Sequence, residues 1–292
     1  MSTKKAAGRR GVPFSLRRFL KISGPQWLLV ALLSTLALFW MFPLLMGLLN
    51  SLKTRAELFT DVLAMPARWS LDNYARGFKR MRYLRSLINT ALIAGGGMAG
   101  IVLFSSMAGW ILCRVKTKLS AFLFGAFVFS MLIPFHSIMI PLYQVARTLK
   151  LSNSILGLCV IYSGLGAGMA VFMYHGFVKT IPKELEDAAA IDGCGPGATF
   201  FTVVFPLLLP ITATICIMNV LWMWNDFLLP LIMLRDASKY TLLLSTNMLF
   251  GQYGSDWPAI LSALILTVIP VVVFYALLQR QILQGIADGA LK

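Results

Sequence analysis

Charged residues are excluded from long stretches of this chain, and this exclusion limits the possible folds more than any other feature. No Lys, Arg, Asp or Glu occurs in residues 22–52, 86–113, 119–146, 151–178, 193–225 and 257–279. Each stretch can hold the roughly 20 residues that an α-helix needs to cross about 30 Å of hydrocarbon. The mean hydropathy of +0.78 agrees with lipid as the surroundings of most of the chain.

The sequence therefore predicts an all-α membrane protein with six transmembrane helices, because every backbone amide in lipid must be bonded within its own segment. We expect the spans near residues 26–49, 86–112, 120–142, 154–177, 203–231 and 259–281. The first apolar run is too long for a signal peptide, and no small-residue cleavage site closes it. We interpret it as a retained first span.

This interpretation divides the chain into a leader, a first span with its loop, a core and a tail. The parts are a cytoplasmic leader (1–25), the first span with an external loop (26–85), a five-span core (86–281) that contains the loop 180–206, and a cytoplasmic tail (282–292). The basic leader, and the basic residues after the second span, favour a cytoplasmic N-terminus. The external loop is also basic, which counts against a simple positive-inside rule, and we give the leader more weight.

The chain lacks the parts that would let it power transport alone. Ion-coupled carriers generally keep ionisable residues inside the membrane, and here only Asp226, His136 and His175 are candidates. No glycine-rich loop ending in Gly-Lys-Ser or Gly-Lys-Thr is present, so the chain has no phosphate cradle. Energy for transport would therefore come from another polypeptide.

Two other classes of protein compete with this interpretation. A stand-alone channel or ion-coupled carrier would need intramembrane charges or inverted repeats, and neither is clear. A membrane-embedded enzyme would need a catalytic constellation, which two distant histidines do not make. The four cysteines form no CxxC pair and no zinc spacing with those histidines, so we expect no metal site and no cofactor in this chain.

An acidic, alanine-rich segment separates the fourth and fifth expected spans. Thr180 suits an N-cap, Pro182 a first helical turn and Gly193 a C-terminal stop, which predicts a helix over 182–193. Its acidic first turn is favoured by the helix dipole, and its alanines form a flat patch where another surface can dock. A soluble helix here suits a part that takes up force from a partner. The alternative is a surface helix that only connects two spans.

The same segment carries a recognisable motif. The pattern Asp187-Ala188-Ala189, then Gly193, Val203 and Phe205-Pro206 resembles the EAA loop of ABC importer permeases. That family typically has Glu first and ends in Ile, any residue, Leu-Pro. The MalG-like carbohydrate permeases are similar through further segments, so that the resemblance covers residues 70–292. These segments are Asn73-Tyr74, Ser86-Leu87-Ile88-Asn89-Thr90, Trp224-Asn225-Asp226-Phe227-Leu228-Leu229-Pro230-Leu231, and the tail from Gly285 to Lys292.

The resemblance implies a type I importer permease with a cytoplasmic coupling helix between the fourth and fifth spans. It implies a bacterial inner-membrane location with both termini in the cytoplasm, and import of a carbohydrate by alternating access. The implied partners are a second, MalF-like permease, two ATPase subunits that hold ATP and Mg, and an extracytoplasmic solute-binding protein; lipid surrounds the chain, and no nucleic acid is expected. The chain itself would be no enzyme. The implied coupling residues are Glu184, Glu186, Asp187, Ala188, Ala189, Asp192 and Gly193.

Polar and aromatic residues in two spans are candidates for a translocation path. Aromatic faces stack on sugar rings, and amides and carboxylates bond hydroxyl groups. For any one of these residues, packing or helix–helix hydrogen bonding is the more frequent explanation. The candidates are Asn219, Trp222, Asn225 and Asp226 in the fifth span, with Ser130, Phe135 and His136 in the third.

A basic patch is expected on the external side, and the sequence leaves its role open. It consists of Arg76, Lys79, Arg80, Arg82 and Arg85. It either touches lipid head groups or attracts an anionic ligand or an acidic binding-protein surface. An anionic oligosaccharide such as alginate would account for a net charge of +15. The sequence also leaves the role of the apolar patch in the loop 232–258 undecided: it either packs on the bundle or faces a docked protein.

Overall fold

The computed structural model describes residues 24–250 and 255–290, and this part of the chain contains helices and no strand. The leader, expected over 1–25, therefore lies almost entirely outside the described residues. The long helices are α1 (Gly24–Ser51), α4 (Tyr83–Arg114), α7 (Ile155–Val178) and α14 (Trp257–Ala290). Each contains a stretch that is long and apolar enough to cross a membrane. α14 continues through most of the segment expected as a separate tail.

The third and fifth expected spans are bent pairs of helices. α5 (Lys118–Ser130) and α6 (Phe135–Thr148) meet at 108°. The segment from α9 (Pro196–Thr199) through η2 (Phe200–Val204) and α10 (Phe205–Leu207) meets α11 (Leu209–Asn225) at 75°. Prolines stand at both breaks and cannot donate to the helical ladder. The spans expected over 120–142 and 203–231 are therefore strongly bent, and the described part holds four candidate spans, or up to six if each pair counts as one.

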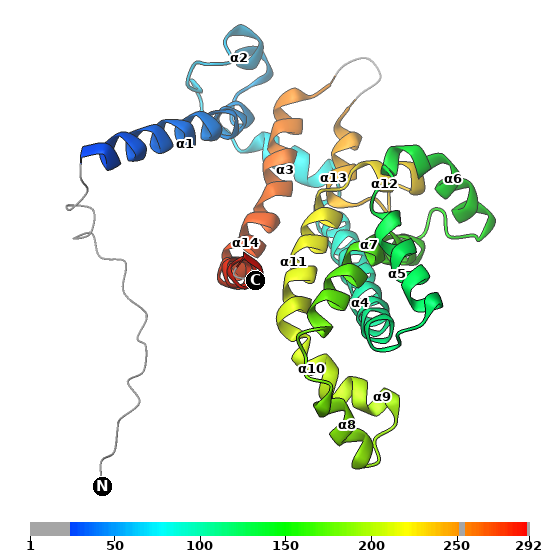
Figure 1. Cartoon of the computed structure of the whole chain (residues 1–292). Coiled ribbons are helices and arrows are strands. Elements are labelled where there is room, and N and C mark those ends of the chain that lie inside the picture. Colours follow the sequence, from blue (N-terminus) through cyan, green and yellow to red (C-terminus); the bar gives the residue numbers. More distant parts are fainter. Residues whose placement is uncertain (1–23, 251–254, 291–292) are drawn as a thin grey trace.

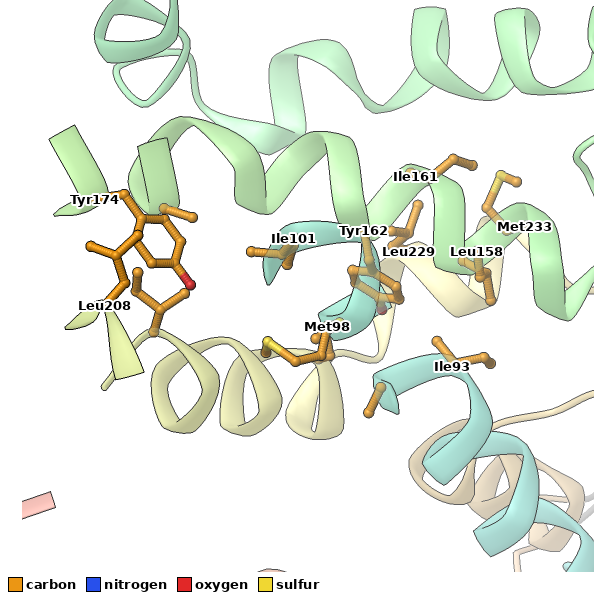
Figure 2. Close-up of a cluster of buried hydrophobic side chains, with 14 of the residues drawn as sticks. Ile93, Met98, Ile101, Leu158, Ile161, Tyr162, Tyr174, Leu208, Leu229 and Met233 are labelled. Carbon is orange, nitrogen blue, oxygen red and sulfur yellow. The ribbon is translucent and has the colours of Figure 1, made fainter. Parts of the chain in front are cut away.

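Close packing of α4 against α7 forms the centre of the bundle. Tyr162 and Tyr174 of α7 are fully buried, and Figure 2 shows Ile93, Met98 and Ile101 of α4 among the side chains of the same cluster. Small residues let the two backbones approach. A Cβ atom added to Gly109 would lie 2.6 Å from the Tyr174 Cβ, so only glycine fits there without movement of a helix.

Helix α1 has a different environment. The most apolar part of this helix is 0% buried within the chain, and Figure 1 shows the helix extending away from the bundle. It is apolar around its whole circumference rather than on one face, as expected for a helix whose neighbours are lipid or another membrane protein.

Short helices and loops close the end of the bundle where α4 and α7 begin. These helices are α2 (Arg55–Thr60), α3 (Asp72–Arg80), α12 (Leu228–Met233), α13 (Leu242–Ser245) and η3 (Thr246–Leu249). Asn89 of α4 donates to the carbonyls of Ser238 and Tyr240, both at 3.0 Å. Leu242 and Leu249 are buried in a cluster with Met81. The buried leucines of the loop 232–258 thus pack on the bundle and are not available to a docked protein.

Gly109→Ala should lower the free energy of unfolding by about 1–3 kcal/mol, because the added methyl group forces α4 and α7 apart. Gly95→Ala is the matched control on the same helix, since a Cβ there meets nothing within 4 Å. The thermal unfolding midpoints of the two purified variants in detergent measure the effect. Equal midpoints for the two variants would contradict the close approach of α4 and α7.

Candidate functional site

The acidic segment between α7 and α11 lies at the opposite end of the bundle from α12 and α13. Figure 1 shows α8 (Glu184–Ile191) and α9 projecting beyond the ends of the long helices. The C-terminal end of α4 reaches the same region through Arg114. This end of the molecule is the candidate site for coupling to a partner.

Helix α8 is shorter than the sequence indicates. It covers Glu184–Ile191 rather than 182–193. Thr180 does not cap it, because its hydroxyl donates to the Phe177 carbonyl at 2.8 Å. Its end does follow the prediction, since Gly193 has a φ of +83°, a conformation in which glycine is least strained. The amides of Gly193 and Cys194 close the last turn on the carbonyls of Ala190 and Ala189.

The expected coupling residues divide between two faces of α8. Glu186 and Ala189 are buried, at 9% and 7% exposure, and face the bundle. They are therefore not part of the surface that a partner can touch, although the sequence places them in one set with the others. The remaining members of the set are exposed: Glu184, Asp187, Ala188, Asp192 and Gly193.

The exposed face of α8 also carries apolar side chains. Ile191 is 87% exposed and Leu185 is 43% exposed. Ile191 was not predicted as a contact residue, although an isoleucine in an alanine-rich acidic helix is a signal that could have indicated it. Apolar side chains at the tip of a projecting helix are typical of a protein–protein contact.

Glu186 is held by side chains of α4. Its carboxylate accepts a hydrogen bond from Trp110 Nε1 at 3.0 Å and forms an ion pair with Arg114, whose Nη2 lies 2.7 Å from Oε1. The same guanidinium donates to the Ile181 carbonyl at 2.8 Å. Trp110 also packs on Phe200, with ring centroids 5.4 Å apart. One cluster thus joins α4 to the chain before α8, to α8 itself and to η2.

The structure brings together only some of the translocation-path candidates. Asp226 accepts a hydrogen bond from the Tyr162 hydroxyl at 2.9 Å and caps α12 through the amides of Leu228 and Leu229. The ring of Trp222 packs edge-on against Tyr162, and Trp222 is 40% exposed. Together with exposed Asn225, these residues form an aromatic and polar surface at the C-terminal end of α11.

Asn219, Ser130 and His136 do not belong to this surface. Asn219 is 4% exposed and donates to the Ile215 carbonyl of its own helix. Ser130 bonds the Phe127 carbonyl and lies against Gly168 of α7. His136 stands after the bend at the start of α6, next to Phe135. These side chains have structural surroundings that the sequence could not show.

The residues of the expected basic patch have different surroundings in the structure. Arg76 forms an ion pair with Asp256 at 3.4 Å, and Arg85 donates to the Ser238 carbonyl at 2.8 Å. Lys79, Arg80 and Arg82 are exposed, and no ion pair engages them within residues 24–250 and 255–290. These three residues are the free part of the patch.

Lys53 is a buried lysine whose structural role was not predicted from the sequence. Lys53 is 1% exposed, and its ammonium donates to the carbonyls of Asp61 and Val62, both at 3.0 Å. It fixes the loop after α2 against the end of α1. Its position just beyond the first charge-free stretch gave no sign of this role.

Comparison with known proteins decides the family. Residues 101–288 match the family described as the inner membrane component of binding-protein-dependent transport systems. The chain belongs to this family. AmyC of Thermoanaerobacterium thermosulfurigenes, named a probable starch degradation products transport system permease protein, is 37% identical over 93% of this chain and 99% of its own length. The melibiose/raffinose/stachyose import permease MelC of Bacillus subtilis is 34% identical over 86% and 91%, respectively.

A solved structure supports the fold. A bacterial ABC transporter involved in the import of the acidic polysaccharide alginate matches with a TM-score of 0.75. It covers 92% of this chain and 99% of the other, at 20% sequence identity. The chain is a carbohydrate ABC importer permease, an inner-membrane transport component rather than an enzyme. Membership in such a system implies ATPase and solute-binding partners.

Proposed function

We propose that this permease forms half of the membrane channel of an ATP-driven oligosaccharide importer, and that α8 is its contact with an ATPase subunit. The observation that carries the proposal is the projecting α8 with its exposed Leu185 and Ile191. The chain has no nucleotide-binding loop of its own. An external motor, which binds ATP and Mg, therefore has to act on a part that protrudes from the membrane.

The proposed topology follows from treating each bent pair as one span. The chain then crosses the membrane six times, with α8 on the cytoplasmic side between the fourth and fifth spans. An even number of crossings places both termini on the same side, the cytoplasm. A second, homologous permease covers the other side of the translocation path, and α1 offers an extended apolar surface to it or to lipid.

Transport proceeds by alternating access in this proposal. Closure of the ATPase dimer moves α8, and rigid-body rotation of the spans opens the path to the outside, where the solute-binding protein delivers the sugar. Trp222, Asn225 and Asp226 lie at the outer end of α11 and offer this chain's sugar contacts. An aromatic face and polar groups side by side suit a sugar ring and its hydroxyls.

Ile191→Glu should reduce co-purification of the ATPase subunits by about tenfold or more, because a carboxylate replaces an apolar contact at the centre of the docking face. Substitution of a side chain that is 87% exposed changes the stability of the permease itself by only about 0.5 kcal/mol or less. The readout is the amount of ATPase retained on the tagged permease.

Leu63→Glu is the matched control for Ile191→Glu. Leu63 is 68% exposed and lies in the loop after α2, at the other end of the molecule. This variant should keep the full amount of ATPase. Retention of the ATPase by both variants would reject the assignment of α8 as the docking helix.

The free part of the basic patch favours a second, narrower candidate: an acidic oligosaccharide as cargo. Lys79, Arg80 and Arg82 present three positive charges to the external solution, and in the described part of the chain no ion pair engages them. Such a field raises the rate at which anionic ligands arrive. An oligosaccharide built of uronic acids, such as one derived from alginate, has the chemistry that this patch would attract.

Replacing Arg80 and Arg82 together by Gln should slow uptake of an acidic oligosaccharide by about threefold to tenfold at low salt, with the difference vanishing at high salt. The control is Lys116→Gln with Lys118→Gln, which removes the same charge at the inner end. Uptake of a radiolabelled oligouronate by proteoliposomes measures the effect. A salt dependence unchanged from that of the starting protein would remove the acidic-cargo candidate and leave the importer function intact.

A further inference from the structure

The inner face of α8 rests on a charged cluster that belongs to a distant part of the chain. Glu186 lies 72 residues beyond Arg114 and 76 beyond Trp110, and both side chains reach it from the last turns of α4. The side chains of the ion pair are only 17% and 10% exposed. A helix of eight residues is too short to be stable on its own, so its position depends on contacts such as these.

The geometry of the cluster makes the connection stiff. Arg114 holds Glu186 through two nitrogens and the Ile181 carbonyl through one of them. Trp110 fixes the second carboxylate oxygen. Charge-assisted bonds of this kind are short and strongly directional, so α8 cannot rotate or slide without carrying the end of α4 with it.

The other connections of α8 run mainly along the chain. α9 and η2 follow it directly and lead into the bent fifth span. The cluster is instead a lateral link to α4, and α4 packs closely along α7 at Gly97 and Gly109. A displacement that enters through the exposed face of α8 can therefore reach the centre of the bundle through this link.

We infer that the Glu186–Arg114–Trp110 cluster passes the displacement of α8 to α4, with Glu186 as a positioning residue that touches neither nucleotide nor sugar. This inference rests on the proposed docking of α8 to an ATPase. It assigns separate tasks to the two faces of the helix: the outer face binds the motor, and the inner face transmits its movement.

The test uses the complete transporter in proteoliposomes, with the solute-binding protein and a transported oligosaccharide present. Glu186→Gln keeps the shape of the side chain and removes its charge. The number of sugar molecules imported per ATP hydrolysed should fall by about fivefold or more, while ATPase subunits still co-purify and still hydrolyse ATP. Glu57→Gln is the control, because Glu57 is also bonded within the chain, to Thr54, but at the outer end; its ratio should not change.

Trp110→Phe supplies an independent variant. It removes the indole donor to Glu186 and keeps an aromatic ring against Phe200. The number of sugar molecules imported per ATP hydrolysed should fall in Trp110→Phe too, but by less than in Glu186→Gln. If Glu186→Gln does not assemble with the ATPase, Trp110→Phe tests the inference in its place.

Two results would overturn the inference. One is an unchanged ratio in assembled complexes of the variants. The other is a loss of ATPase binding in Glu186→Gln and in Trp110→Phe alike, which would show that the cluster only holds α8 in place. Neither result would contradict the proposal that α8 docks to an ATPase subunit. That proposal is rejected instead if Ile191→Glu retains the ATPase.

Discussion

Helix α4 is the element on which the rest of the structure depends, because it pairs closely with α7 and carries a polar connection at each end. Gly97 and Gly109 remove the side chains that would separate the two helices. Near its N-terminal end, Asn89 binds the loop that contains Tyr240. At its C-terminal end, Arg114 binds Glu186. In lipid, where apolar burial does not drive helices together, close packing and such polar contacts determine which helices associate.

The architecture gives the two ends different properties. The end that holds α12 and α13 is closed by short helices and buried leucines, and it carries exposed Arg80, which no ion pair engages within residues 24–250 and 255–290. The opposite end projects α8, whose Ile191 is 87% exposed. This division suits the proposed function, in which cargo arrives on one side and mechanical work on the other. The buried ion pair is costly to desolvate, and a link that must remain in one geometry gives a reason for it.

Several parts of this account could be predicted from the sequence. The charge-free stretches predicted the positions of α1, α4, α7 and α14, and Gly193 predicted where α8 ends. Pro134 and Pro210 indicate where the third and fifth spans bend, but the size of the bends could not be predicted, since hydropathy measures composition rather than direction. Hydropathy also could not show that Glu186 is buried and Asp187 is exposed. Two neighbouring acidic residues look alike in sequence, and only the fold shows that Arg114 binds Glu186.

The central claim is that α8 lies in water on the side of the membrane that an ATPase can reach. Labelling of single cysteines with a membrane-impermeant maleimide tests it most directly, after the native cysteines Cys113, Cys159, Cys194 and Cys216 are replaced by serine. Ile191→Cys should react in inverted membrane vesicles and not in right-side-out vesicles, and Leu63→Cys should show the reverse. Labelling of Ile191→Cys from the outside, or from neither side, would contradict the account.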